Sequence, residues 1–201
     1  MLIQKLIIYG AVLLAVFSLF YKGDDVVLGP GVKAPMVPAQ KTITSAPKFV
    51  LNQFSITPLA SYSITAKILS RKDYRTGAAS ELSPFDFALG WGNMSDESIS
   101  SQFEIVQSGR WYCWRFPGEE PPISPKEVNR CSANVHIIPA NSVVQSVLDD
   151  MKKGQIVTLQ GKLVRVDATD GWNWESSLTR EDTGSRACEV FYVESGFPMI
   201  Y

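Results

Sequence analysis

The chain opens with an almost uninterrupted apolar run. Residues Leu6–Tyr21 carry no charged side chain, and the apolar start of the chain ahead of them is broken only by Gln4 and Lys5. A helix needs about 20 mostly apolar residues to cross the hydrocarbon core of a bilayer. The long side chain of Lys5 can reach the lipid headgroups from the end of such a span. The pattern therefore predicts a transmembrane anchor over residues 1–22, with residues 2–21 in contact with the membrane.

Two other interpretations of this run stay open, namely a cleaved signal peptide and a buried core helix. A signal peptide ends in small residues before its cleavage site, whereas this run ends in Phe20, Tyr21 and Lys22. A lipid anchor on cysteine is not expected either, because the first cysteine of the chain is Cys113. The end of the run therefore favours an uncleaved anchor.

Prolines and glycines interrupt the pattern that follows the apolar run. Seven of them fall between residues 23 and 47. Residues of these two types break helices and central strands. We therefore expect residues 23–47 to form an extended linker, which would hold the folded domain away from the bilayer at ~3 Å per residue.

Alternation of polar and apolar positions begins at about Lys48. It is clear over residues 61–70, where tyrosine, isoleucine and alanine alternate with serine, threonine and lysine, and over residues 156–166. A period of two residues is typical of a half-buried strand. Similar but shorter patterns predict further strands over residues 49–56, 103–106, 109–116, 134–138 and 187–193.

One segment has the period of an amphipathic helix. It begins after Asn141, a candidate N-cap, and ends before Gly154. Shorter helical turns are expected at Ser83–Asp86, where a proline follows a possible N-cap, and at Ser95–Glu97. We therefore expect one domain over residues 48–201, of class α+β and mainly β. The apolar face of the long helix consists of Val143, Val144, Val147, Leu148 and Met151.

The stretch 154–194 resembles part of an OB-type barrel. It reads GQIVTLQGKLVRVD, then DGWNWESSLTREDTG and then ACEVFYV, the order of a bent strand, a polar loop and a further strand. The resemblance implies an OB-like barrel, a fold that binds oligonucleotides, oligosaccharides or proteins. The segments LSPFDFALGWGNMSD, GRWYCWRF, SANVHIIPA and SLTREDTG also resemble a family of uncharacterised bacterial envelope proteins with one membrane anchor. This second resemblance implies a location and no activity.

Charge limits the class of partner and sets the expected orientation. Without Lys5 and Lys22, the chain has 17 basic residues against 20 acidic ones, a net charge of −3. A general nucleic-acid binder would be strongly basic, so no nucleic-acid partner is expected. The positive-inside rule places the N-terminus in the cytoplasm. In a bacterial host, which we assume, the anchor would lie in the inner membrane and the domain in the periplasm.

Three cysteines, Cys113, Cys131 and Cys188, lie in the part of the chain expected outside the cytoplasm. An oxidising compartment permits one disulfide and leaves one thiol. Cys113 and Cys131 flank a proline-rich loop, so we expect these two residues to pair. Closing a loop of ~18 residues would stabilise the fold by roughly 3 kcal/mol.

His136 is the only histidine and therefore the only candidate for catalysis through an imidazole. A Cys–His–carboxylate site would need Cys188, together with Asp182 or Glu189, to fold beside it. A lone histidine in a strand is more often structural, so a non-enzymatic role is preferred. The chain shows no zinc-ligand spacing and no EF-hand, phosphate-loop or Rossmann pattern. No metal and no cofactor are expected.

Tryptophan and arginine side chains give the main candidate contact surface. Within residues 109–116, alternation places Trp111, Cys113 and Arg115 on one face of the strand and Tyr112, Trp114 and Phe116 on the other. The structural alternative is that these aromatic side chains fill the core. Likewise, the segment SLTREDTG is either a recognition loop or a salt-bridged turn. The candidate binding residues are Trp114, Arg115, Trp172, Trp174, Arg180 and Asp182.

These patterns together predict a membrane-anchored periplasmic binding or accessory protein that contacts a partner protein or another envelope component. Two alternatives stay open. The first is an envelope hydrolase or transferase that uses His136. The second is an oligosaccharide-binding module with an OB-like groove.

Overall fold

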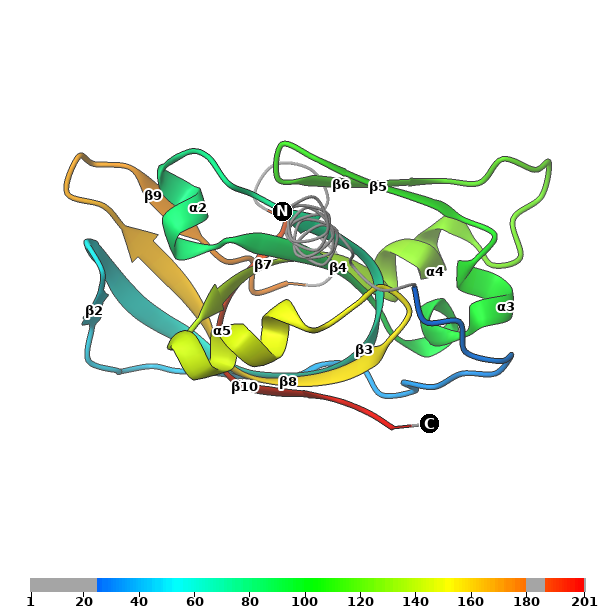
Figure 1. Ribbon diagram of the computed structural model, residues 1–201, viewed down its shortest axis with the longest axis horizontal. Helices are drawn as coiled ribbons and strands as arrows, with labels where there is room; N and C mark the ends of the chain where they lie inside the picture. Colours follow the sequence, from blue (N-terminus) through cyan, green and yellow to red (C-terminus); the bar gives the residue numbers. More distant parts are fainter. Residues whose placement is uncertain (1–24, 180–186, 201) are drawn as a thin grey trace, which may run out of the picture.

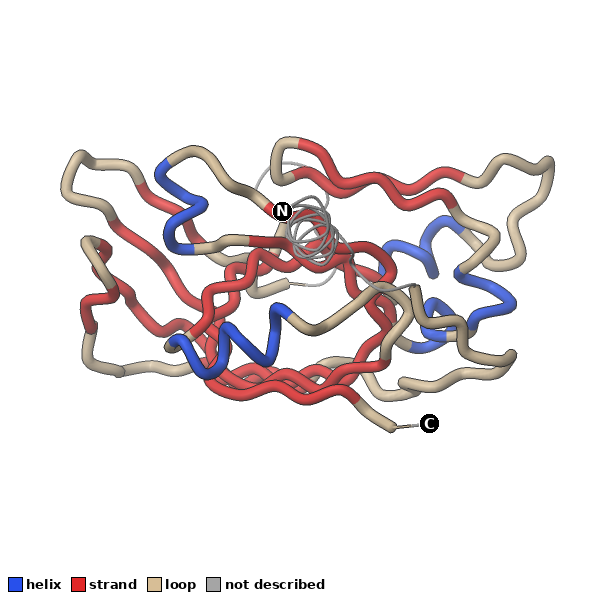
Figure 2. The backbone as a smooth tube through the Cα atoms, in the orientation of Figure 1, coloured by secondary structure: helices blue, strands red, loops and turns tan. Residues whose placement is uncertain are grey.

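The computed structural model describes residues 25–179 and 187–200, and these residues form a mainly β structure (Figures 1 and 2). Its strands are β1 Ala39–Thr42, β2 Phe49–Leu51, β3 Phe54–Asp73, β4 Phe85–Gly90, β5 Glu104–Ser108, β6 Trp111–Arg115, β7 Ser132–Pro139, β8 Ile156–Asp167, β9 Asn173–Glu175 and β10 Glu189–Pro198. Its helices are α2 Ala78–Leu82, the 3-10 turn η1 Gly92–Ser95, α3 Glu97–Ser100, α4 Pro125–Arg130 and α5 Ser142–Asp149.

The segment predicted to be a membrane anchor lies outside the described residues. Within the two described ranges, none of the helices has the length and apolar character needed to cross a bilayer.

Strand β3 is the longest element, and it pairs with β1, β2, β4 and β8. The sequence predicts separate strands over residues 49–56 and 61–70. The structure instead folds the first of these back on itself as the β2–β3 hairpin, and β3 then continues to Asp73. Asn52 lies in the turn with a left-handed φ of 54°, a conformation that asparagine tolerates.

The pairings of five strands return to their starting point. Strand β3 pairs with β4, β4 with β7, β7 with β10, β10 with β8, and β8 with β3. Of these pairs only β7–β10 is parallel, so the sheet is mixed. Alternate side chains of these strands, among them Phe87, Val135 and Phe191, form the main core. Helix α5 connects β7 to β8 and packs against β7 and β10.

Helix α5 begins where the sequence predicts. The side chain of Asn141 accepts hydrogen bonds from the backbone N–H groups of Val143 and Val144, each at 3.0 Å. The predicted apolar face is only partly buried. Val144 and Leu148 face the core, whereas the side chain of Val143 is 73% exposed. Adjacent helical residues point about 100° apart, so one contact surface cannot cover both of them.

Residues Ser83–Asp86 do not form the predicted helical turn. Helix α2 ends at Leu82 and β4 begins at Phe85, so the chain is already extended where a helix was expected. Every residue of β4 is buried, because the strand lies between β3 and β7. The alternation of Phe85, Phe87 and Leu89 therefore outweighs the local signal of a serine followed by proline.

The described part of the predicted linker lies against the domain. The backbone N–H of Val26 donates to the carbonyl oxygen of Lys153 at 2.9 Å, Ala34 is buried, and β1 pairs with β3. Gly154 permits the close crossing, because a Cβ at this position would lie 1.6 Å from the carbonyl oxygen of Val26. The prolines do not prevent this docking, since edge strand β1 contains none of them.

Strands β5 and β6 form a separate two-stranded hairpin, which contacts β3 through β5 and β7 through β6 (Figure 1). Gly109 and Arg110 have φ values of +56° and +71°, as in a type I′ turn. The faces predicted for this strand are confirmed. Tyr112 and Trp114 are half-buried, whereas Trp111 and Cys113 are exposed.

Candidate functional site

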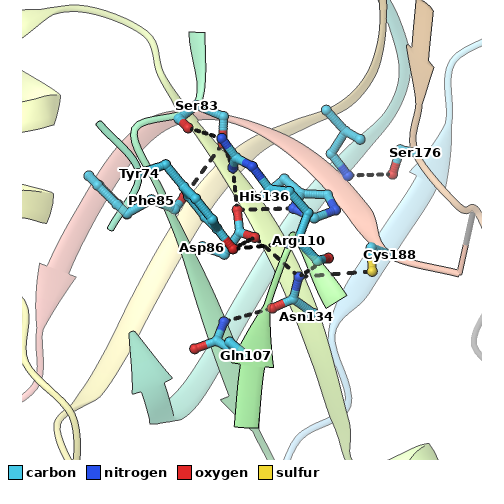
Figure 3. Close-up of polar contacts among 11 residues, drawn as sticks. Tyr74, Ser83, Phe85, Asp86, Gln107, Arg110, Asn134, His136, Ser176 and Cys188 are labelled. Atoms are coloured by element: carbon cyan, nitrogen blue, oxygen red, sulfur yellow. Dashed lines mark hydrogen bonds and ion pairs between the residues drawn. The ribbon is translucent and has the colours of Figure 1, made fainter. Parts of the chain in front are cut away.

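Three polar side chains lie on the outer faces of the two central strands (Figure 3). Alternate residues of β4 and β7, such as Phe87 and Val135, face the core, so Asp86, Asn134 and His136 face outward. All three are nevertheless buried. The tip of the β5–β6 hairpin and strand β9 cover them. The alternation of side chains along β4 and β7 therefore places three polar groups close together on the outer face of the sheet, beneath the hairpin tip and β9.

Asp86 is the centre of this cluster. Its Oδ1 accepts a hydrogen bond from Nη1 of Arg110 at 2.6 Å and lies 2.9 Å from Nδ1 of His136. Its Oδ2 accepts hydrogen bonds from the Tyr74 hydroxyl at 3.0 Å and from Nδ2 of Asn134 at 3.4 Å. A carboxylate with no exposed surface is stable only with partners of this kind. Four side chains from three segments thus surround one carboxylate, and three of them donate hydrogen bonds to it.

Arg110 reaches the cluster from the tip of the hairpin. Its guanidinium also donates to the hydroxyl and carbonyl oxygens of Ser83, at 3.0 and 2.6 Å. Its Cζ lies 3.7 Å from the centre of the Tyr74 ring and 5.4 Å from that of the Trp174 ring. These distances are those of cation–π contacts. The arginine therefore joins the hairpin, the start of β4 and strand β9.

Tyr74 acts as a hydrogen-bond donor to the cluster. Burial raises the pKa of its hydroxyl to about 12, and the negative charge of Asp86 acts in the same direction. The phenol therefore stays protonated at neutral pH. Its oxygen also accepts a hydrogen bond from the backbone N–H of Arg110 at 3.3 Å. The connection between β3 and β4 is in this way attached to the hairpin.

His136 lies beside a carboxylate, but no nucleophile among the described residues is bonded to it. Its ring is buried 4.3 Å from that of Trp174, and its Nδ1 contact with Asp86 lacks the geometry of a hydrogen bond. Among the described residues, no serine or cysteine is hydrogen-bonded to the imidazole. Cys188 instead lies 3.9 Å from Nδ2 of Asn134. Within the described residues, the contacts of the cluster therefore join structural elements, and Cys188 is not bonded to the imidazole.

Two of the predicted binding residues lie together beside this cluster. The ring centres of Trp172 and Trp174 are 5.8 Å apart. Trp174 packs on His136, and Trp172 packs edge-on against Phe54. Trp174 is half-buried and Trp172 is 38% exposed, so this pair lies at the surface and does not fill the core.

The other predicted binding residues are not gathered into one surface. Trp114 faces inward on β6 and donates from Nε1 to Asn129 at 2.8 Å. Arg115 faces outward and pairs with Glu104 at the surface. Arg180 and Asp182 lie outside the described residues.

A cleft of about 430 Å³ lies between β6 and the start of β7. Four of its thirteen described lining residues are aromatic, one is a carboxylate, Glu189, and none is a lysine or arginine. The sequence identified Trp114 here but missed Asn129 and Ser132, because helix α4 and its packing were not predicted. The lining consists of Trp91, Trp111, Tyr112, Cys113, Trp114, Asn129, Ser132, Ala133, Asn134, Thr179, Ala187, Cys188 and Glu189.

The predicted disulfide between Cys113 and Cys131 is wrong, because both residues are free thiols. Strand β6 directs Tyr112 to the Ser132 hydroxyl at 2.9 Å. Cys113, the next residue, therefore points to the opposite, exposed face. Cys131 lies behind the hairpin beside Gly92, and burial raises the pKa of its thiol. Spacing along the chain could not reveal on which side of the strand each thiol would lie.

The described part of the chain contains no group of three or more histidine, cysteine, aspartate or glutamate side chains that could hold a metal ion. No protein-family model, curated protein or solved structure matches the chain. Any functional conclusion therefore depends on the geometry of the cluster and the cleft.

Proposed function

We propose that this chain is a membrane-anchored, non-enzymatic binding protein whose domain binds a partner protein or another envelope component in the cleft beside β6. The observation that carries the proposal is the cleft itself, of about 430 Å³, with its aromatic lining. Hydrogen bonds from Tyr112 to Ser132 and from Trp114 to Asn129 hold two of the lining rings in place. Rings that are ordered before a ligand arrives lose less conformational entropy on binding.

The ring of strand pairs supports an OB-type barrel as the frame of this site. Strands β3, β4, β7, β8 and β10 take part, and a helix connects the third of these strands in chain order to the fourth. OB-folds bind oligonucleotides and oligosaccharides on their second and third strands and on the loops after the first and fourth. Those strands correspond to β4 and β7 here. The cleft lies against β7, in agreement with binding at this face.

The Asp86 cluster supports the cleft mechanically in this proposal. Nδ2 of Asn134 donates to the carbonyl oxygen of Arg110 at 3.3 Å, and Nε2 of Gln107 donates to Oδ1 of Asn134 at 2.7 Å. These bonds join the hairpin, which carries one wall of the cleft, to β7, which carries the other. The buried polar network therefore sets the spacing between the two walls.

The proposed location rests on the sequence before the domain. The apolar run and the charge at its start favour an anchor in a bacterial inner membrane, with the N-terminus in the cytoplasm and the domain in the periplasm. Membership of the family of bacterial envelope proteins described above belongs to the same proposal.

Photo-crosslinking in intact cells tests the proposed binding site. A photoreactive amino acid at Trp111, which lines the cleft and is 53% exposed, should give a defined adduct. The same amino acid at Val143, exposed on helix α5 away from the cleft, is the matched control. Equal labelling at both positions, or none at Trp111, would contradict binding in the cleft. The mass of the adduct distinguishes a protein from another envelope component.

An oligosaccharide is a second candidate ligand, favoured by one observation. The cleft combines tryptophan rings with the neutral polar groups of Asn129 and Ser132, a combination that suits stacking and hydrogen bonding to sugars. Titration of tryptophan fluorescence with neutral glycan fragments tests this reading. A saturable change that is lost in Trp111→Ala would support it, and the absence of any change across a broad panel would exclude it.

A further inference from the structure

The cleft is bordered by a strand edge that has no partner. Strand β6 pairs with β5 and with no other described strand. Four consecutive residues of β6, Trp111 to Trp114, line the cleft. Because successive side chains of a strand point to opposite faces, a continuous lining of this kind belongs to the edge of the strand and not to one of its faces.

The turn of the hairpin fixes which backbone groups point into the cleft. The loop has two residues, Gly109 and Arg110, and pairs Ser108 with Trp111. In an antiparallel pair, hydrogen-bonded and non-hydrogen-bonded residue pairs alternate, and a two-residue loop of this type is closed by a hydrogen-bonded pair. The N–H and C=O groups of Tyr112 and Trp114 therefore point away from β5.

The wall opposite this edge belongs to a part of β7 that β10 does not pair with. It is formed by the first residues of β7, Ser132 to Asn134, and β10 begins to pair with β7 only at Val135. Side-chain bonds, such as that from Tyr112 to Ser132, connect the two walls at this level. No main-chain ladder between β6 and β7 occurs in the described structure. Among the described strands, β5 is therefore the only main-chain partner of β6.

We infer that the cleft binds an extended polypeptide segment, which adds to the free edge of β6 as a third strand of the hairpin. This inference rests on the proposed binding function and names the class of ligand. Main-chain hydrogen bonds supply affinity in such strand addition, and pockets for alternate side chains supply specificity. The four residues of β6 at the cleft match a segment of about four residues, ~13 Å long. Acidic side chains are not expected in this segment, because the described lining carries aromatic rings and one carboxylate, Glu189, and no cation.

Selected peptides and amide exchange test the inference on the full chain in detergent. Ten-residue peptides are selected from a random displayed library, and the hydrogen exchange of each β6 amide is measured by NMR with and without a selected peptide. The amides of Tyr112 and Trp114 should exchange about tenfold or more slowly in the complex, because they gain partners. The amide of Cys113 is the internal control, since it already faces β5, and its exchange should stay unchanged.

N-methylation of the peptide provides an independent measurement. Methyl groups at alternate backbone nitrogens should weaken binding by about 5- to 10-fold, the effect of one lost hydrogen bond, while methylation at the intervening positions should be tolerated. Binding that is indifferent to all methyl groups, or slower exchange spread over the whole strand, would overturn strand addition. If photo-crosslinking at Trp111 succeeds but only glycans bind, or no peptide is selected, the peptide inference fails and the binding function stands. If Trp111 gives no specific adduct, the binding function itself fails.

Discussion

Nη1 of Arg110 lies 2.6 Å from Oδ1 of Asp86, so the tip of a surface hairpin is attached near the start of the buried strand β4. This contact joins the part of the molecule that carries the cleft to the part that carries the core. The carboxylate has no exposed surface, whereas the guanidinium is partly accessible. The pair therefore belongs to the class in which removal of one partner leaves an uncompensated buried charge.

Replacement of Asp86 by asparagine should therefore destabilise the fold by about 3 kcal/mol or more. The amide cannot neutralise Arg110, and it accepts hydrogen bonds more weakly from Tyr74. Urea unfolding followed by tryptophan fluorescence measures the effect. Glu104→Gln, which removes a carboxylate from an exposed pair with Arg115, is the matched control and should change stability by about 0.5 kcal/mol or less. Similar effects of the two substitutions would contradict a central role for Asp86.

A milder change in the same cluster keeps the test informative if Asp86→Asn fails to fold. Tyr74→Phe removes one hydrogen bond to Asp86 and leaves the ring beneath Arg110. The expected loss is about 1 kcal/mol. An unchanged free energy of unfolding in this variant would show that the Tyr74 hydroxyl contributes nothing to the cluster.

Alkaline pH should weaken the fold through two tyrosines. Burial raises the pKa of Tyr74 and of Tyr112 to about 12, whereas an unfolded tyrosine has a pKa of about 10. Below pH 10 both the folded and the unfolded protein keep the phenolic protons, so the two tyrosines make their full contribution to the free energy of unfolding there. Between pH 10 and 12 the unfolded state ionises first, and stability falls.

Absorbance of the ionised phenol in the folded protein should show late titration, near pH 12, for these tyrosines. Urea unfolding at the two ends of this pH window should show the fall, and the double variant Tyr74→Phe, Tyr112→Phe should flatten it. A titration in which every tyrosine of the folded protein ionises near pH 10 would refute the burial of both hydroxyls.

Two glycines with the same backbone conformation allow a sharp test of how the N-terminal segment is docked. Gly154 and Gly171 have φ values of +89° and +88°, but only at Gly154 would a Cβ collide with backbone, at the carbonyl oxygen of Val26. Gly171→Ala should cost about 1 kcal/mol of left-handed strain. Gly154→Ala should cost clearly more and should also expose residues near Val26 to limited proteolysis. Equal stability and equal cleavage in the two variants would exclude the close crossing.

Cys113 and Cys131 should react with a thiol reagent at different rates, because they differ in exposure. Cys113 is exposed and should be labelled rapidly by a thiol reagent in the native protein. Cys131 should be labelled more slowly, because burial raises the pKa of its thiol and so lowers the fraction of thiolate. Mass mapping without reductant should find the two residues unlinked. A Cys113–Cys131 crosslink in the native protein would contradict the structure.

Local sequence patterns predicted the parts of the fold that depend on residues close together in the chain. The alternation in residues 109–116 was sufficient to place Tyr112 and Trp114 on the inner face, and Asn141 was sufficient to mark the start of α5. The helical turn expected at Ser83 failed because pairing on both sides makes β4 a fully buried strand. That pairing involves residues far away in the sequence, which no local signal contains.

The candidate site was less predictable than the fold for the same reason. His136 was visible as the only histidine, but its neighbours Asp86 and Trp174 come from segments about 40 to 50 residues away in the sequence. The partnership of Arg110 with Asp86 depends on how the hairpin folds over β4. Likewise, the local pattern could not show that β5 is the only described strand that pairs with β6. The composition indicated aromatic contact residues, but only the tertiary structure shows which of these side chains line the cleft.

The crossing of Val26 over Gly154 limits how far the domain can move from its support. Under the proposed anchor, five peptide steps separate Tyr21, at the end of the apolar run, from the docked Val26. Five steps of extended chain span at most roughly 17 Å. Under this anchor, Val26 would lie close to the membrane surface. The linker would then hold the domain much closer to the bilayer than ~25 extended residues at ~3 Å each would allow.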